Sequence, residues 1–481
     1  MAHPGLSLRI EKRDFLECVF RTDGAGELFS NHAPLESFDL VIANPPYVRT
    51  QILGAKQAQL LSERFGLSGR VDLYFPFLLG ISQILAPDGV TGVIVSNRFL
   101  TTKSGQTVRR ELLKCFRIHH AWDLGDTKLF DAAVLPAVLI STGRGISSAE
   151  PIAFSSIYEC EEEPREHAAD PLAALSCSNG AIVAIPDGRR FHVLHGTLDN
   201  GGDPEGVWRV ATDTSDLWLE TVKAHTWATF SRIGKVRVGV KTTCDKVFIR
   251  SDWDRMPENE RPELLRPLTT RHCAQRYKPA PAKIPKHILY THEAMPAGRA
   301  PVDLARYPRS AKYLEIHRAT LEARTYVINA GRKWYEIWVP QAPEAWGAMK
   351  LIFPDISEKP VFWIDKEGTI VNGECYWLRC EGDADPDWLW LALAVANSTF
   401  IELFYDRRFH NKLYAGRRRF MTQYVEQFPL PDPSSALARS IVETAKMIYE
   451  AAPDEAAKAI ARDLDAMVLN AFGLPIEEIP R

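Results

Sequence analysis

The sequence lacks the cysteine and histidine spacings that mark disulfide-rich or zinc-binding proteins. Its eight cysteines are scattered over 481 residues without a C-x-x-C pair, and its thirteen histidines include no H-E-x-x-H. This pattern argues against a disulfide framework and against a metal site. It indicates reduced thiols in a cytoplasmic protein.

The chain also lacks a secretory signal and any apolar run long enough to span a membrane, so no membrane partner is expected. The formal net charge is -3, which gives no global basic excess. Any contact with nucleic acid must therefore come from a local basic patch. The apolar and charged fractions, 46% and 25%, are typical of a soluble globular protein.

The first 145 residues alternate strand-like and helix-like stretches. This alternation predicts an α/β fold with a parallel sheet and crossover helices. We expect a strand that leads to a loop within residues 6–17, further strands within residues 38–47, 90–100, 117–125 and 135–142, and helices within residues 71–89 and 105–116.

The character of the chain changes three times after that region. Residues 146–206 read as a last strand ("PIAFSSI") and a linker, because acidic and small residues dominate there. Residues 207–433 are rich in Trp, Tyr, Arg and Pro and predict a second, mixed α+β domain. Residues 434–481 form a C-terminal segment in which amphipathic spacing predicts helix.

One stretch of the first region, "FDLVIANPPYVRT" at residues 38–50, carries chemistry. The apolar run predicts a buried strand, and the two prolines stop it abruptly. Ligands bind at the carboxyl ends of strands in open α/β sheets. The Asn44 amide oxygen and the Pro45 carbonyl can both accept hydrogen bonds from an amino group on a planar base, which localises its lone pair. The Tyr47 ring can stack on that base.

The "NPPY" motif resembles the catalytic motif of the gamma-class adenine-N6 DNA methyltransferases of type II restriction–modification systems. The resemblance covers residues 10–145 and implies a partial Rossmann-like sheet that binds S-adenosyl-L-methionine (SAM). It also implies double-stranded DNA as partner, with the target adenine flipped from the duplex at a cost of roughly a few kcal/mol. "KLFDAAVLPAVLIS" resembles the late motif of the family, in which Phe130 would flank the adenine opposite Tyr47. Phe130 can alternatively be a core residue.

The resemblance also implies cofactor contacts. "RDFLE" is similar to the Asp-Phe-Leu segment of the family. Asp14 would then accept a hydrogen bond from the SAM adenine, and Phe15 would pack on its face. Asn44, Pro46 and Asp72 would lie on the cofactor side. No metal site is expected.

One departure from the family is large. The glycine-rich SAM loop should precede "RDFLE", but only thirteen residues precede Asp14. A β-α-β-α stretch needs about 50 residues or more. We therefore expect an N-terminally incomplete methyltransferase with an uncovered apolar sheet face. An upstream methyltransferase fragment or a restriction nuclease subunit would be its possible partners.

The second domain resembles the target-recognition domain of type II methyltransferases. Its "DRRFHNKLYAGRRRF" segment at 406–420 interleaves basic and aromatic residues, which suits phosphate contacts and stacking. The DNA-binding candidates are Arg407, Arg408, Lys412, Arg417, Arg418 and Arg419. A solvated charged face is the alternative interpretation.

Two other functions stay open at the level of sequence. One is a non-catalytic DNA-binding specificity subunit or remnant. The other is an RNA or protein-glutamine methyltransferase, since NPPY also suits those targets. The long segment 207–433 counts against the second of these, because such enzymes are typically small.

Overall fold

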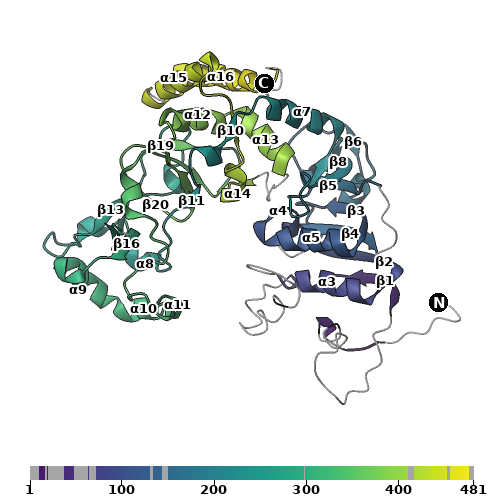
Figure 1. Ribbon diagram of the computed structural model, residues 1–481, viewed down its shortest axis with the longest axis horizontal. Coiled ribbons are helices and arrows are strands. Elements are labelled where there is room, and N and C mark those ends of the chain that lie inside the picture. The colour runs from purple at the N-terminus through teal and green to yellow at the C-terminus, as the bar shows by residue number, and fades with distance from the viewer. Residues whose placement is uncertain are drawn as a thin grey trace. The chain divides into compact units, whose positions relative to one another are not determined.

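The computed structural model describes residues 10–12, 14–16, 19, 37–47, 63, 72–130, 134–143, 150–296, 298–409, 417–451 and 455–475. The chain divides into two compact units (Figure 1). The first unit comprises residues 1–216 and 408–416, and the second comprises residues 217–407 and 417–481.

The described part of the first unit contains one sheet of nine strands in the order β1-β2-β4-β3-β5-β8-β7-β6, with β9 paired to β8. The strands are β1 (Phe38–Ala43), β2 (Leu85–Ser96), β3 (Arg117–Asp123), β4 (Pro136–Thr142), β5 (Ala153–Glu159), β6 (Glu166–His167), β7 (Ile182–Ala184), β8 (Arg190–Asp199) and β9 (Arg209–Ala211).

The sheet is mixed, whereas the sequence predicts a parallel sheet. Strand β1 pairs parallel with β2 and β3 pairs parallel with β5, but β4 lies antiparallel between β2 and β3. The described residues of the connection between β3 and β4 contain no crossover helix, which fits a strand that returns antiparallel to its predecessor. Strands β1, β2, β3 and β5 still share one direction, so their carboxyl ends meet at one edge.

Helices cover one face of this sheet. They are α3 (Tyr74–Ile84), α4 (Arg98–Thr101) and α5 (Gln106–Cys115). The short helix α6 (Pro171–Ala174) packs in a separate core cluster with residues of β5, β7 and β8. Apolar residues of α3 and α5 form one core with inward-facing residues of β2, β3 and β4. The periodicity of α5 fits this packing, because Val108 and Leu112 are one turn apart and both are buried.

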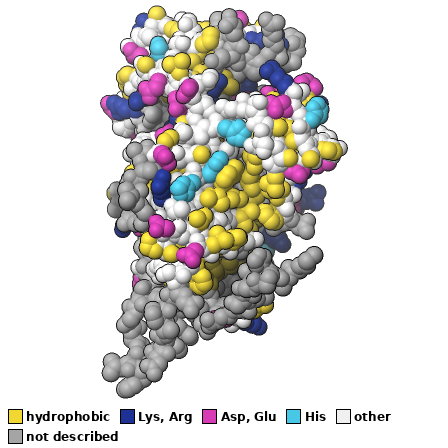
Figure 2. Space-filling model, turned by 90° about the vertical axis from the view of Figure 1, so that its right-hand side faces the viewer, with side chains coloured by type: hydrophobic (Ala, Val, Ile, Leu, Met, Phe, Trp, Pro, Cys, Tyr) yellow, Lys and Arg dark blue, Asp and Glu magenta, His cyan; other side chains and the backbone are white. Residues whose placement is uncertain are grey.

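The opposite face, which we call the outer face, is defined by Leu40, Ile42 and Val90. Their exposed fractions are 60%, 81% and 40%. Figure 2 shows hydrophobic side chains gathered on one side of the molecule. The prediction that residues 38–43 form a buried strand is therefore wrong. Strand β1 lies at the end of the described sheet, and only its Val41 and Ala43 side chains pack on the core.

Residues 150–206 are also more structured than the predicted linker, because they extend the sheet through β5, β6, β7 and β8. The acidic residues Glu161, Glu162 and Glu163 are exposed just after β5. Strand residues such as Phe154 of β5 and Phe191 of β8 are buried, and five consecutive residues of β5 are buried. The acidic residues therefore belong to a turn, whereas the segments around them form strands of the sheet.

The second unit contains several small sheets around a tryptophan-rich core. Trp346, Trp363 and Trp377 are completely buried in it. Its strands are β10 (Ala228–Thr229), β11 (Arg237–Val238), β12 (Ile249–Arg250), β13 (Leu265–Thr269), β14 (Lys286–Leu289), β15 (His292–Met295), β16 (Gly298–Pro301), β17 (Lys350–Pro354), β18 (Ile356–Ser357), β19 (Trp363–Asp365), β20 (Ile370–Val371), β21 (Cys375–Leu378), β22 (Arg418–Arg419) and β23 (Pro429–Leu430).

Helices complete the second unit, some of them at points where the chain passes between the units. They are α7 (Asp213–Ala224), α8 (Asp245–Phe248), α9 (Pro308–Ile316), α10 (Arg318–Glu322), α11 (Thr325–Asn329), α12 (Asp387–Ala396), α13 (Thr399–Phe409), α14 (Thr422–Val425), α15 (Ala436–Glu450) and α16 (Glu455–Ala471). The last two lie where the amphipathic pattern predicts helix. The Ser435 hydroxyl caps α15 by accepting from the Ala438 amide at 3.1 Å.

In the described residues, no single helix is long and apolar enough to cross a membrane. Helices α12 and α13 reach the necessary length only together, and they are bent by 73°. Residues Leu389–Ala396 of α12 are buried.

Candidate active site at the carboxyl edge of the sheet

The Asn44–Tyr47 loop follows directly after β1 at the carboxyl edge. Asn44 and Pro46 are exposed, Pro45 is buried and Tyr47 is half-buried. The two prolines fix their own φ angles and offer no backbone donor, so the chain cannot continue the ladder. The loop therefore presents the Asn44 amide to solvent from a rigid backbone.

Tyr47 orients that amide. Its hydroxyl donates to Asn44 Oδ1 at 2.9 Å, and the Ile94 carbonyl of β2 lies 3.4 Å from the same hydroxyl. Burial raises the pKa of Tyr47, so the hydroxyl remains a donor at neutral pH. A carboxamide oxygen has two lone pairs. Asn44 Oδ1 can therefore keep this bond and accept a second one from a substrate amino group.

The amino-terminal half of α3 contributes two aromatic rings that pack against candidate site residues. Tyr47 packs edge-on against Tyr74, with ring centroids 6.4 Å apart. Phe15 stacks on Phe77 with centroids 5.0 Å apart and an interplanar angle of 18°. Two candidate residues that are distant in sequence, Phe15 and Tyr47, thus lie against the same helix.

The acidic candidates are less constrained. Asp14 is exposed, and its Oδ1 accepts from the Leu16 amide at 2.9 Å. Asp72 precedes α3, and its carboxylate lies 3.7 Å from Arg98. A carboxylate can accept from the amino group of an adenine, and a half-buried ring can pack on a purine face. These residues therefore fit the adenosine end of a nucleoside cofactor.

Phe130 is 41% exposed and belongs to the chain between β3 and β4. Both ends of this connection, residues 124–135, are fixed at the carboxyl edge. The Leu124 amide donates to the Pro136 carbonyl at 2.9 Å, and the Asn97 amide donates to the Leu135 carbonyl at 2.8 Å. The exposure of Phe130 argues against the alternative of a core residue.

Sequence reasoning missed three polar residues at this edge, Asn97, Asp123 and Tyr158. They lie at or just after the ends of β2, β3 and β5, and hydrogen bonds join their side chains. Polar residues that end apolar strands, as in "IVSN" and "HAWD", were the available signal. In the described residues, no group of three or more His, Cys, Asp or Glu side chains could hold a metal ion.

The basic candidates of residues 406–420 differ among themselves. Arg417 is exposed, whereas Arg407 lies over the Trp218 ring at 4.4 Å. Burial, with nearby Arg209 as a second cause, lowers the pKa of Arg408. Lys412 lies outside the described residues.

The last two arginines are bound to carboxylates. Arg418 has a side chain only 7% exposed and pairs with Asp406 at 2.7 Å and Glu402 at 3.1 Å. Arg419 forms a two-pronged pair with Asp355 at 3.1 and 3.0 Å. The prediction that Arg418 contacts DNA is not supported by this arrangement, because its guanidinium is buried and already neutralised.

Comparisons with known proteins identify both units. The family of Eco57I restriction-modification methylases matches residues 16–130, and the TaqI-like C-terminal specificity domain matches residues 302–430. The type II methyltransferase M.BanIII of Aneurinibacillus aneurinilyticus is 37% identical over 471 residues, which is 96% of this chain and 81% of that protein. The type II methyltransferase M.PaeR7I of Pseudomonas aeruginosa is 25% identical over 467 residues, 93% of this chain and 72% of that one.

Among solved structures, the fold is similar to the type IIL restriction-modification enzyme MmeI in complex with DNA. The TM-score is 0.58 at 14% sequence identity, over 91% of this chain and 54% of that chain. The present chain thus spans about half the length of that enzyme.

The fold and the edge loop define an α/β methyltransferase unit joined to a C-terminal specificity domain. The chain belongs to the type II methyltransferases of restriction–modification systems. Membership of this family confirms SAM as the cofactor that the sequence analysis expects.

Proposed function

We propose that the chain provides the catalytic and specificity parts of a gamma-class adenine-N6 DNA methyltransferase, which modifies an adenine flipped out of double-stranded DNA. The observation that carries this proposal is the Asn44–Tyr47 loop. Its exposed amide oxygen is held by the Tyr47 hydroxyl at 2.9 Å, at the edge where the parallel strands end.

The chain's own residues act on the amino group of the base. Asn44 Oδ1 and the Pro45 carbonyl accept hydrogen bonds from its two N–H groups, which draws the hydrogens out of the ring plane and frees the nitrogen lone pair. Tyr47 and Phe130 stack on opposite faces of the adenine and keep it out of the duplex. The bound SAM supplies the methyl group. Asp14, Phe15, Pro46 and Asp72 would hold the cofactor.

The second unit would read the DNA. Its Arg407, Arg417 and Arg419 remain proposed basic contacts, as do Arg408 and Lys412 of the segment 408–416, which belongs to the first unit. The fold shared with a restriction–modification enzyme in complex with DNA supports this role for the unit. We place the protein in the cytoplasm, where its DNA substrate is.

The outer face supports the proposal that a further methyltransferase segment completes the cofactor site. A sheet face that exposes Leu40 and Ile42 by 60% and 81% favours association with an apolar partner. The glycine-rich loop of such a segment would bind the cofactor beyond the adenine end. Without it, the loss of two or three hydrogen bonds should weaken SAM binding by about 10²-fold.

Isothermal titration of the 481-residue chain with SAM measures this directly. We expect weak binding by the chain alone and recovery when the upstream segment is added. Stoichiometric micromolar binding by the chain alone would contradict the need for a partner.

The catalytic assignment is tested with Asn44→Ala. Loss of one acceptor that acts in the transition state should lower methyl transfer by about 10²–10³-fold and leave duplex binding nearly unchanged. The enzyme, supplied with the upstream segment where required, is expressed in a host, and sequencing of host DNA for N6-methyladenine identifies the target site. The purified enzyme is then assayed on that site.

Asn179→Ala is the matched control, because it also removes an exposed side-chain amide oxygen from the first unit, one that accepts from the His195 amide at 2.8 Å. A normal rate for Asn44→Ala would disprove the pocket assignment. DNA binding without methylation by the wild type would favour a non-catalytic specificity subunit. Methylation of RNA or of a peptide glutamine in place of DNA would favour the remaining alternative.

A further inference from the structure

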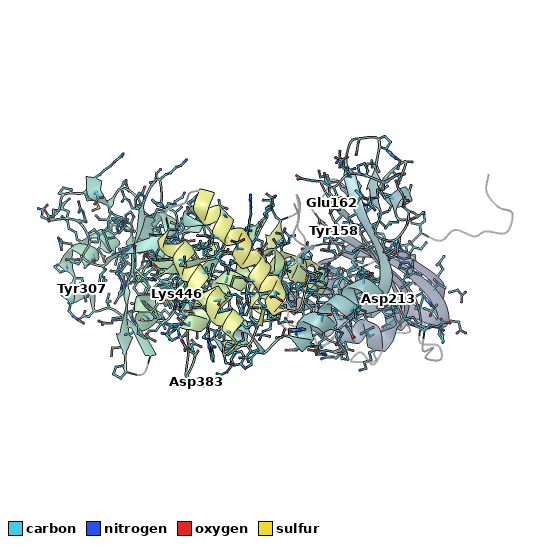
Figure 3. The ribbon with its side chains drawn as sticks, turned by 90° about the horizontal axis from the view of Figure 1, so that it is seen from above. Tyr158, Glu162, Asp213, Tyr307, Asp383 and Lys446 are labelled. Carbon is cyan, nitrogen blue, oxygen red and sulfur yellow. The ribbon has the colours of Figure 1, made fainter. Side chains whose placement is uncertain are left out.

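Three side chains from separate strands meet below the carboxyl edge of the first unit. The Tyr158 hydroxyl, which Figure 3 labels, donates to Asp123 Oδ2 at 2.6 Å. The Asn97 amide nitrogen lies 2.9 Å from Asp123 Oδ1 and 3.2 Å from the Tyr158 oxygen. The three groups therefore form a closed triangle of hydrogen bonds with the carboxylate as common acceptor.

The carboxylate in this triangle is buried without a cation. Asp123 is 3% exposed, and it accepts hydrogen bonds from the neutral groups of Asn97, Tyr158 and the Gly125 amide. In the described residues it takes part in no ion pair. Burial raises the pKa of Asp123 to about 6. The group is still ionised at neutral pH, and its charge is held by hydrogen bonds at a cost in stability.

Three charged residues, Asp126, Lys128 and Glu159, lie near the triangle. Asp126 accepts from the Glu159 amide at 2.7 Å, and Lys128 lies 3.9 Å from the Glu159 carboxylate. Asp126 raises the pKa of Asp123 further. A buried, uncompensated carboxylate at a ligand-binding edge is a common mark of function.

The triangle holds the connection that carries Phe130. Asp123 Oδ1 accepts from the Gly125 amide at 3.2 Å and so sets the first turn of residues 124–135. Gly125 has φ +45°, and an added Cβ would lie 2.3 Å from the Ile157 carbonyl oxygen, so only glycine fits. Asn97 fixes the other end, because its backbone amide bonds the Leu135 carbonyl while its side chain bonds Asp123.

Strand β2, which ends just before Asn97, also anchors the Asn44 loop. Ala43 is paired with Val93 of β2, and the Ile94 carbonyl lies 3.4 Å from the Tyr47 hydroxyl. Asn97 follows three residues later. Strand β2 is therefore the common support of the two loops whose rings would stack on opposite faces of one base.

We propose that Asn97, Asp123 and Tyr158 are positioning residues that hold the two described ends of the β3–β4 connection, and with them Phe130, in register with the Asn44 loop around the target base. This inference rests on the proposed function. The three residues do not touch the substrate, and they act through Phe130.

Tyr158→Phe tests this with the least disturbance, since it removes only the hydroxyl. We expect about a tenfold lower rate of methyl transfer at saturating DNA, from the loss of one hydrogen bond to a charged group, and DNA affinity within twofold of the wild type. The wild-type rate should fall below pH about 6 as Asp123 becomes protonated. Because the lost donor favours the charged carboxylate, this acid limb should move to higher pH in Tyr158→Phe. Asn97→Ala should act in the same direction.

A duplex with 2-aminopurine at the target base reports stacking independently of methyl transfer. We expect brighter fluorescence with Tyr158→Phe, because a misplaced Phe130 quenches the flipped base less. Tyr290→Phe is the matched control, because it removes a buried tyrosine hydroxyl of the second unit that donates to the Pro340 carbonyl at 2.7 Å. It should change neither the pH profile nor the fluorescence.

The inference is overturned if Tyr158→Phe and Asn97→Ala keep the wild-type rate, acid limb and fluorescence. It is also overturned if their rates of methyl transfer fall only in proportion to the fraction of folded protein, while the pH below which the rate declines stays unchanged. Failure of the proposed function looks different, because the wild type itself would then not methylate adenine.

Discussion

The two units contain buried charges that are stabilised in opposite ways. In the second unit, Arg418 lies between the carboxylates of Glu402 and Asp406, at 3.1 and 2.7 Å. In the first unit, Asp123 accepts from the neutral donors of Asn97, Tyr158 and Gly125 and forms no ion pair within the described residues.

The difference separates a structural charge from a charge that we assign to function. Arg418 ties α13 to β22, and each charge in its cluster offsets another. Asp123 gains no such compensation, and its charge opposes folding. Natural proteins keep destabilising groups of this kind mainly where activity needs them. Burial alone therefore does not say what a charged residue does, and its partners must be known.

The largest effect is expected from Arg418→Ala. Removing the guanidinium leaves Glu402 and Asp406 without their shared partner, and breaking a buried pair costs about 3–5 kcal/mol. Their side chains are 26% and 25% exposed, so the lower end of this range applies. Chemical denaturation should show the loss in the free energy of unfolding.

Arg417→Ala is the control, because Arg417 is exposed. Its stability should change by less than about 0.5 kcal/mol. If Arg417 binds a phosphate, the log–log salt slope of DNA binding should fall by about 0.9. Equal stabilities for the two variants would show that Arg418 is not structural and would break the comparison.

Asp123 is expected to make a smaller contribution to the free energy of unfolding, and this contribution depends on pH. Its pKa is about 6 in the folded chain and 3.8 ordinarily, so the folded state binds the proton more tightly. This stabilisation is complete below pH 3.8 and is lost as the pH rises through about 6. Since one pKa unit corresponds to about 1.4 kcal/mol, at most about 3 kcal/mol is lost by pH 7.

Asp123→Asn does not titrate and should lack this contribution. The difference in unfolding free energy between the wild type and Asp123→Asn, measured from pH 4 to pH 8, isolates it. A wild type that gains stability relative to Asp123→Asn as the pH rises would reverse the sign and show that the carboxylate is stabilised by its surroundings.

Much of the first unit could be predicted from local patterns. The apolar run at 38–43 and its stop at Pro45 predict β1 and the loop that follows it, and the spacing of 105–116 predicts α5. The antiparallel β4 could not be predicted, because strand direction depends on which neighbours pair and leaves no mark on the strand's own residues. The strands β6 to β8 were not predicted, because the acidic turn at Glu161–Glu163 made that part of the sequence look like a linker.

The candidate site divides in the same way. Asn44, Pro45 and Tyr47 lie within four consecutive residues, so their common geometry is a local property of the chain. The cluster joins Tyr158 to Asp123 and Asn97, which precede it in the chain by 35 and 61 residues. Such a cluster is visible only after the strands are paired.

The sequence by itself determined the edge loop and the family, because prolines and an apolar strand act locally and a motif of adjacent residues survives in the linear order. Tertiary structure alone decided which charges are buried. Arg417 and Arg418 are neighbours in the same basic run, yet one is exposed and the other is buried between two carboxylates. The physical reason is that the free energy of a charge depends on its solvation and on its partners, and both come from residues far away in the chain.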